Sequence, residues 1–276
     1  MRTATLLSST LLAAVLLPTA QAQQGVHLAS GLTDFTTWTL LGSATASNDT
    51  PGNGFTYSTM RLTAIGTNGQ AGAGFAPHAL SIDFNQAFSF DFHFFIPVVN
   101  TLRGDGLTFT LAGAPGVGNG GSGLGYENLG THSVAFAIDT FNFVGEPVSP
   151  SLQILQAGSV APLAATETGL GDSIRDPNFQ WYASVNYAPS GSHNNAGMLT
   201  GRIEHINLGS FSVAAAVDFS ALGLAGNPVY YGFTASTGLA TDGHYITSGV
   251  PVPEPGSWAL LLAGLTAVLV VGRRRG

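Results

Sequence analysis

Apolar and polar residues alternate along much of the chain, which is the pattern of a half-buried β-strand. Every second residue of the segment 88–94 is Phe, and Ser, Asp and His stand between them. Similar alternation, or a run of β-favouring residues, recurs at 107–111, 134–138, 211–213 and 229–234. Clusters of Gly, Asn and Ser at 113–123 and 189–197 separate these runs as loops do. The pattern therefore predicts many short strands joined by glycine-rich turns.

Between the two ends of the chain no stretch shows sustained helical periodicity, no segment repeats, and no linker is long enough to divide the body. Strands of this kind are typical of a β-sandwich or barrel. We therefore expect one all-β domain over residues 23–250, with room for a core of Phe, Leu and Val between two sheets.

The N-terminal residues 1–22 read as a secretory signal peptide. Arg2 supplies the positive start, 11–17 is a short apolar run, and 19–22 offers an A-x-A cleavage site. The alternative is a buried N-terminal helix. A small-residue site at the position that a signal requires favours the signal peptide.

The C-terminal residues 251–276 combine three features in order. A Val-Pro-Glu-Pro sequence at 252–255 precedes an uncharged stretch at 256–272, and three arginines follow at 273–275. The stretch is at the lower limit for a transmembrane segment, and the arginines would hold its end on the cytoplasmic side. This arrangement resembles the PEP-CTERM sorting signal of Gram-negative bacteria that make exopolysaccharide. The resemblance implies export, a transient inner-membrane anchor and processing by an exosortase-type enzyme; an ordinary single-span anchor is the alternative.

Composition narrows the functions open to the body between these ends. The chain has 276 residues, no Cys, and only 8% charged residues, and all its Lys and Arg positions are Arg. Chemistry based on Cys is excluded, and so is a duplex nucleic-acid interface, which needs clustered basic residues. Residues 23–255 keep four arginines and all fifteen acidic residues, a formal net charge of −11. Such a body disfavours anionic partners and is compatible with a hard cation such as calcium.

Three short segments carry candidate chemistry. Asp105 stands between two glycines just before a predicted strand, which places a carboxylate at the rim of a sheet. A glycine-rich run at 120–125 exposes backbone amides to a ligand. Asp139, Asn142 and Glu146 follow another strand and offer oxygen ligands. Taken singly, each segment has a plain alternative as a turn, a flexible loop or a carboxylate that accepts from nearby backbone amides.

Taken together and in order, these segments resemble the L-type (legume-type) lectins, whose fold is a concanavalin-like jelly-roll β-sandwich. The resemblance runs from Gly104 to Ser248 and rests on the segments 104–109, 120–126, 134–141, 181–187, 217–220, 229–238 and 244–248. It implies an exported carbohydrate-binding protein without catalytic activity, with a glycan such as the cell's own exopolysaccharide as its partner.

The resemblance also implies the residues of a sugar site. Asp105 would follow a cis peptide bond after Gly104 and accept hydrogen bonds from two adjacent sugar hydroxyls. A backbone amide of Gly121 or Ser122 would donate to one of those hydroxyls. The loop that contains Asp242 would close the pocket. Charge-assisted hydrogen bonds of this kind make recognition directional.

By the same resemblance, a calcium ion is expected at Asp139, the Phe141 carbonyl, Asn142 and Glu146. Asn142 is then a candidate for the sugar site as well as for the metal site. In the family, calcium fixes the loop that contacts the sugar.

The sequence departs from the family at several positions of this strand and loop. Ala137 stands where the family has a metal-binding Glu, and Ser151 stands where it has a His. We therefore expect no transition-metal ion. Phe143 replaces the expected Asn, and Phe143 or Tyr126 would stack on the apolar face of a sugar.

Two other functions stay open. The altered metal ligands are consistent with a structural matrix protein that kept the lectin fold without sugar binding. A glycoside hydrolase on the same fold needs paired carboxylates. The Glu residues that precede the sorting motif, at 127, 146, 167 and 204, do not alternate with a second acid on one strand. This argues against the hydrolase.

Overall fold

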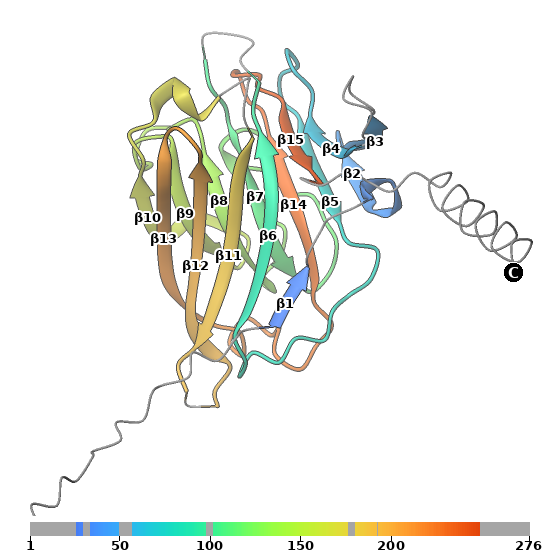
Figure 1. Cartoon of the computed structure of the whole chain (residues 1–276), viewed down its shortest axis with the longest axis vertical. Coiled ribbons are helices and arrows are strands. Elements are labelled where there is room, and N and C mark those ends of the chain that lie inside the picture. Colours follow the sequence, from blue (N-terminus) through green and yellow to red (C-terminus); the bar gives the residue numbers. More distant parts are fainter. Residues whose placement is uncertain are drawn as a thin grey trace, which may run out of the picture.

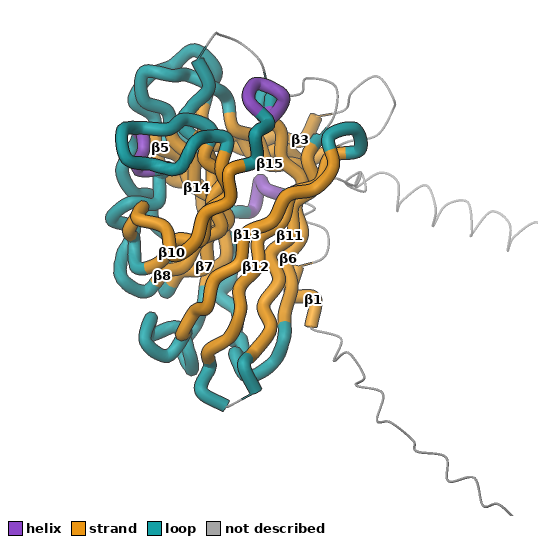
Figure 2. Tube along the Cα trace, turned by 90° about the vertical axis from the view of Figure 1, so that its left-hand side faces the viewer, coloured by secondary structure: helices purple, strands orange, loops and turns teal. Residues whose placement is uncertain are grey.

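The computed structural model describes residues 26–29, 34–49, 57–97, 102–175, 180–191 and 193–248, and it confirms the all-β class. Two sheets lie face to face, as the view in Figure 1 and the view turned by 90° in Figure 2 both show. Apart from β1, which pairs in parallel with β6, all strand pairs of the described residues are antiparallel.

The first sheet consists, within the described residues, of β1 (Val26–Ala29), β3 (Thr45–Asp49), β4 (Tyr57–Thr63), β6 (Phe88–Phe95), β11 (Trp181–Pro189), β12 (Ala196–His205), β13 (Gly209–Asp218) and β15 (His244–Thr247). The second consists of β2 (Thr39–Gly42), β5 (Ala71–Phe75), β7 (Gly106–Ala112), β8 (Ser133–Asp139), β9 (Ser151–Gln156), β10 (Ser159–Glu167) and β14 (Tyr230–Ser236). Their orders are β13-β12-β11-β6-β15-β4-β3, with β1 beside β6, and β10-β9-β8-β7-β14-β5-β2. Three short 3-10 helices, η1 (Phe35–Thr37), η2 (Gly121–Gly123) and η3 (Gly171–Ile174), lie in the loops. Each strand predicted from the pattern corresponds to one of these strands.

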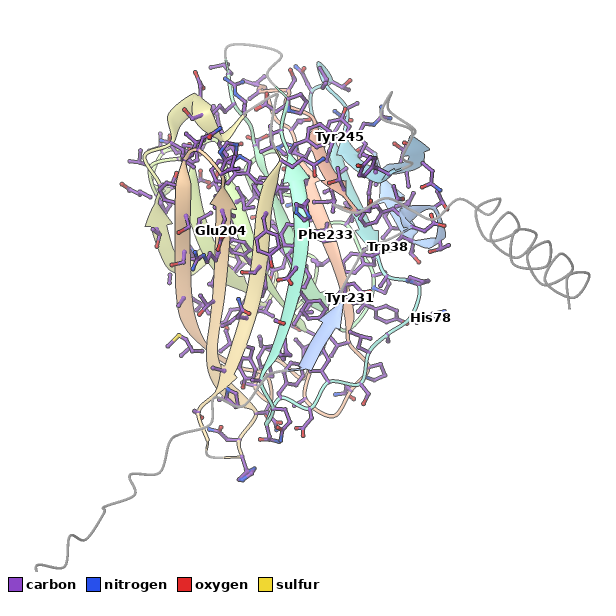
Figure 3. All side chains as sticks on the ribbon, viewed as in Figure 1. Trp38, His78, Glu204, Tyr231, Phe233 and Tyr245 are labelled. Carbon is purple, nitrogen blue, oxygen red and sulfur yellow. The ribbon has the colours of Figure 1, made fainter. Side chains whose placement is uncertain are left out.

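The alternation of Phe in β6 places one face of this strand in the core between the sheets. Phe88, Phe90, Phe92 and Phe94 are buried, and the residues between them are partly exposed. The ring of Phe90 lies 4.9 Å from that of Phe109 in the opposite sheet. Toward β2, the indole of Trp38 stacks on the ring of Phe233 in β14. Both residues are labelled in Figure 3. Period-2 patterning thus decides which side of the first sheet meets the second.

The second sheet differs from the half-buried pattern, because the central strands β7 and β8 are buried on both faces. The hydroxyl of Thr108 lies 2.8 Å from those of Thr110 and Thr234, so these polar side chains pair with one another. The Thr234 hydroxyl donates to the carbonyl of Leu124 in the glycine-rich loop. This loop covers the outer face of the sheet, which a local pattern of alternation cannot reveal.

No helix in the described part of the chain is long and apolar enough to cross a membrane. The predicted signal peptide at 1–22 and the predicted transmembrane segment at 256–272 lie outside the described residues.

Candidate functional site: a buried carboxylate at the end of the second sheet

Strand register brings three loops together at one end of the second sheet. Gly106 at the start of β7 pairs with Asp139 at the end of β8 and, on its other side, with Ser236 at the end of β14. Asp105 therefore lies between the loop that follows β8 and the loop that follows β14. Two of the three segments singled out from the sequence thus meet at this end of the sheet, and the glycine run joins them through Gly121.

The Gly104–Asp105 peptide bond is cis, as the lectin resemblance implied. The backbone of Asp105 is held on both sides, because its N–H donates to the carbonyl of Ser236 (3.0 Å) and its carbonyl accepts from the N–H of Thr140 (2.9 Å). The side chain is 4% exposed, and its Oδ2 atom has no hydrogen-bond partner among the described residues. A buried carboxylate oxygen without a partner is costly, and it indicates a position at which a donor from a ligand would be stabilised.

The surroundings of Asp105 disfavour its charged form. Burial raises the pKa of this carboxyl to about 6. The Gly238 backbone N–H lowers this pKa, while the negative charges of Glu146 and Asp242 raise it further. Hydroxyl donors from a ligand would offset this penalty by bonding to the carboxylate.

Two glycines allow the backbone to approach Asp105 closely. A Cβ at Gly238 would lie 3.0 Å from Asp105 Oδ2 and 3.4 Å from the Cα of Gly121. Gly121 itself has φ +61°, a conformation that favours glycine. Ser122 beside it is exposed to solvent. The N–H of Gly121, one of the two predicted donors, donates to the carbonyl of Thr237 (3.3 Å). Gly238 lies beside both Gly121 and Asp105, and it is an additional site residue that the sequence pattern did not single out.

Asp242 was expected to contact the sugar, and its carboxylate oxygens bond to the protein instead. The residue is fully buried; Oδ1 accepts from the Arg175 guanidinium (3.3 Å) and Oδ2 from the N–H of Gly104 (3.0 Å). Asp242 is therefore linked to Asp105 by its hydrogen bond to the backbone of Gly104. Its partner Arg175 lies 67 positions away, so no local pattern could have identified it.

The predicted calcium ligands form a hydrogen-bonded cluster. Oδ1 of Asp139 accepts from the Phe141 N–H (3.1 Å), and Oδ2 accepts from the Gln153 side-chain amide (2.8 Å). Burial raises the pKa of Asp139 to about 8, with a further contribution from Glu146. Gln153, on β9, is buried and was not singled out from the sequence; its signal is an amide between two apolar residues, Leu152 and Ile154.

The other two side chains of this set are also engaged. Oε2 of Glu146 accepts from the Phe143 N–H (2.5 Å), and Oδ1 of Asn142 accepts from the Ser149 hydroxyl (3.3 Å). Within the described ranges, no group of three His, Cys, Asp or Glu side chains could hold a metal ion. Protein donors thus already bond to a carboxylate or amide oxygen of every side chain in the set, which does not favour the expected cage.

Of the two aromatic candidates, only Phe143 is accessible. Its side chain is 61% exposed on the loop that follows β8. Tyr126 is buried beneath the glycine-rich loop, and its hydroxyl lies 3.0 Å from the Ser133 hydroxyl. Phe143 is therefore the candidate whose ring is accessible for stacking on a ligand.

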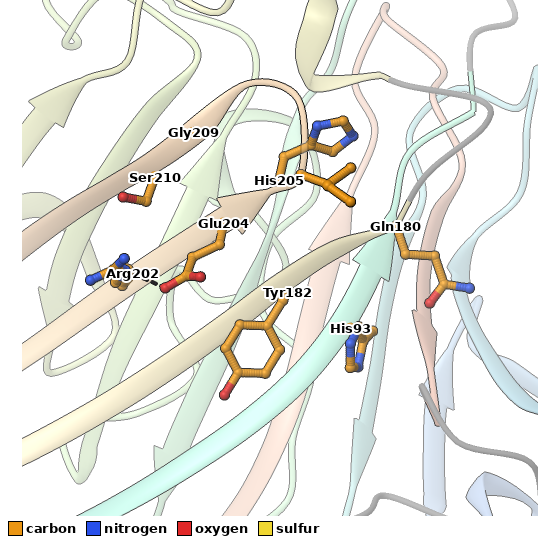
Figure 4. Close-up of a pocket in the computed structure, with 9 residues that line it drawn as sticks. His93, Gln180, Tyr182, Arg202, Glu204, His205, Gly209 and Ser210 are labelled. Atoms are coloured by element: carbon orange, nitrogen blue, oxygen red, sulfur yellow. Dashed lines mark ion pairs between the residues drawn. The ribbon is translucent and has the colours of Figure 1, made fainter.

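A separate hollow of about 460 Å³ lies on the first sheet (Figure 4). It is open to solvent and polar, and its charged side chains, Arg202 and Glu204, form an ion pair with an N–O distance of 2.6 Å. Both are nearly half exposed. No side chain of this hollow shows the combination that marks Asp105, a buried carboxylate with a free oxygen.

The two-sheet architecture matches the fold of the legume lectins. Among solved structures, the chain is similar to a lectin from Bauhinia forficata in complex with GalNAc (TM-score 0.63, 20% identity, covering 79% of this chain and 92% of that one). It is also similar to the basic winged bean lectin with Tn-antigen (0.60, 24%, 80% and 92%). A third is lectin I-B4 from Griffonia simplicifolia in a metal-free form (0.57, 20%, 76% and 90%). At these identities the likeness shows the fold.

Residues 251–275 match the PEP-CTERM protein-sorting motif, which confirms the sorting signal expected there and indicates an exported protein. No curated protein sequence matches the chain.

Proposed function

We propose that this protein is an exported, non-catalytic carbohydrate-binding protein. The observation that carries the proposal is the carboxylate of Asp105, buried at a loop junction of a lectin fold with Oδ2 lacking a partner. Sugar hydroxyls are donors of the kind that such an oxygen requires. Of the two predicted amide donors, Gly121 already donates to Thr237, so we assign the bond to the same sugar to the backbone amide of Ser122. The exposed ring of Phe143 would pack on the apolar face of the sugar.

We further propose that the glycan is an exopolysaccharide at the surface of the cell that makes the protein. The sorting motif at 251–275 supports this, because it indicates export and an exosortase-type partner that processes the C-terminal segment. The body carries a formal net charge of −11 over residues 23–255, which favours neutral over acidic glycans.

Calcium at Asp139, Phe141, Asn142 and Glu146 stays a prediction that the present ligand geometry does not favour. At least one oxygen of each side chain in this set already accepts a hydrogen bond within the protein. No step of recognition is therefore assigned to a metal ion.

The test is a glycan array followed by titration calorimetry with the strongest ligand, with calcium and with EDTA. Asp105→Asn should weaken binding at least about tenfold, because each hydrogen bond to a charged group contributes about 1.5–3 kcal/mol. Glu204→Gln, on the outer face of the other sheet, is the matched control and should bind as the wild type does. Unchanged affinity in Asp105→Asn would refute the assignment of this residue.

A second candidate function is a structural matrix protein that has the lectin fold and binds no sugar. The hydrogen bonds that Asp139 and Glu146 already accept within the protein favour it, since they disfavour a metal ion that would order a sugar loop. A wild-type protein that retains no glycan on the array, in calcium or in EDTA, would support this candidate. Release of reducing sugar from a bound polysaccharide would instead contradict both non-catalytic functions.

A further inference from the structure

We infer that the buried ion pair of Arg175 and Asp242 positions the Gly104–Asp105 segment, so that the protein itself, without a cation, holds the Asp105 carboxylate in place. This inference rests on the proposed function, because positioning Asp105 affects sugar binding only if Asp105 binds the sugar. The geometry that supports it does not depend on any ligand.

Asp242 binds both backbone groups of Gly104. Its Oδ2 accepts from the Gly104 N–H at 3.0 Å, and its own N–H donates to the Gly104 carbonyl at 3.2 Å. On the other side of the cis bond, the Asp105 N–H donates to Ser236 and the Asp105 carbonyl accepts from Thr140. All four backbone polar groups of the segment thus have protein partners, which leaves the direction of the Asp105 side chain determined by the fold.

The remaining oxygen of Asp242 faces Arg175. Oδ1 lies 3.3 Å from Nη1, and both side chains are almost completely buried, at 0% and 2% exposed. A buried carboxylate without a counter-charge would be strongly disfavoured, because the interior solvates charge poorly. Burial raises the pKa of Asp242, while the Gly104 N–H and the Arg175 guanidinium lower it. Arg175 therefore stabilises the ionised form of Asp242, in which its other oxygen is a strong acceptor for Gly104.

A second arginine extends the network from this pair to the loop that follows β8. Asp172 accepts from Arg175 (2.8 Å) and from Arg103 (2.9 Å) at the surface. Arg103 also donates to the carbonyls of Thr140 (3.1 Å) and Ser149 (3.3 Å). Two of the four arginines of a sparsely charged body therefore lie in this one network, next to the only cis bond that precedes a non-proline residue in the described part of the chain.

Stability alone does not account for a buried pair in this position. Apolar residues of similar volume usually stabilise an interior equally well, so a buried ion pair is weak support for stability. What apolar residues cannot supply is an acceptor for the Gly104 N–H. The pair therefore points to placement of the segment as its role.

By the lectin resemblance, calcium would hold the segment that contacts the sugar. In this structure, hydrogen bonds within the protein hold it. In the expected calcium set, side-chain oxygens accept from Phe141, Phe143, Gln153 and Ser149. Asp242 is not a member of this set, and it bonds to the backbone of Gly104. The expected consequence is an Asp105 segment that stays ordered in EDTA.

The test compares Arg175→Met with the double variant Arg175→Met/Asp242→Asn in the full exported protein in EDTA. The readouts are the hydrogen-exchange rates of the Gly104 and Asp105 amides by NMR, and the affinity for the glycan identified on the array. Arg175→Met should raise both exchange rates at least tenfold and weaken binding at least tenfold, because Asp242 loses its counter-charge.

The double variant should return both readouts to within about threefold of wild type, because the neutral Asn carbonyl accepts from Gly104 without a counter-charge. A packing role for Arg175 would leave the double variant as impaired as the single one. Arg202→Met, which breaks the exposed ion pair on β12, is the control and should change neither readout.

Unchanged exchange rates in Arg175→Met, or a double variant that fails to fold or stays impaired, would overturn the inference. Should Arg175→Met itself not fold, the double variant still decides it, since it must fold with wild-type exchange rates. A wild-type protein that binds no glycan would refute the proposed function alone, because the exchange rates still report whether the pair positions the segment.

Discussion

His244 is the first residue of β15, and it anchors the Asp242 loop from the side of β4. The Thr63 hydroxyl donates to the carbonyl of Asp242 (3.0 Å) and lies 2.7 Å from Nδ1 of His244. A hydroxyl has one proton, so this network assigns the imidazole proton to Nδ1. Nε2 is then a bare acceptor, and it has no partner within the described residues. Protonation of Nε2 would create a buried charge and an unpaired donor.

Burial accordingly lowers the pKa of His244 from 6.5 to about 3. Below pH 6.5 the unfolded chain takes up a proton at this residue and the folded chain does not. The contribution of His244 to the free energy of unfolding is therefore fully present above pH 6.5, and it is lost as the pH falls toward 3. The loss is about 1.4 kcal/mol per pH unit, or about 2 kcal/mol in the free energy of unfolding between pH 6.5 and about pH 5.

The perturbation is His244→Asn, whose amide can donate to Thr63 in place of Nδ1–H and cannot titrate. At pH 7.5 the variant should be less stable by about 1–2 kcal/mol, because the ring leaves a void. At pH 5 this difference should shrink by about 2 kcal/mol. Urea denaturation at the two pH values measures both numbers, and comparing the variant with wild type cancels the titration of other buried groups such as Asp105.

The control is His78→Asn, at an exposed position (Figure 3), which should leave the difference between the two pH values unchanged. A His244→Asn variant that stays equally far below wild type at both pH values would refute the assigned state of the imidazole.

Two further substitutions test the packing of the site and of the core. Gly238→Ala should weaken glycan binding at least about fivefold while the free energy of unfolding changes by less than about 1 kcal/mol, because the new methyl lies 3.0 Å from Asp105 Oδ2; full affinity in calorimetry would contradict the assigned site. Gly201→Ala should destabilise the protein by about 1–3 kcal/mol in urea, because its Cβ would overlap the ring of Phe136 from the opposite sheet; a change under about 0.5 kcal/mol would show that the sheets adjust.

Much of the fold was predictable because its signals are local. The Phe alternation of 88–94 determines a strand and its inward face, since side chains of a strand alternate with period two. Glycine clusters mark the turns, and the terminal signals combine charge with apolar runs of characteristic length. Asp105 could be singled out for a similar reason, because it stands between glycines directly before a strand.

Tertiary structure alone decided which polar groups meet. The Gly104–Asp242 bond spans 138 positions, and the Arg175–Asp242 pair spans 67. Single-sequence patterns carry no signal for such pairings. Asp242 was therefore expected to contact the sugar, whereas its carboxylate oxygens accept hydrogen bonds from Gly104 and Arg175. Burial is decided in the same way, because the glycine-rich loop folds over Thr108 from a distance. The sequence by itself thus determined the strongly patterned strands, the sorting signal and the acidic body. The contacts that hold the Asp105 carboxylate at the end of the sheet follow only from bringing remote segments together.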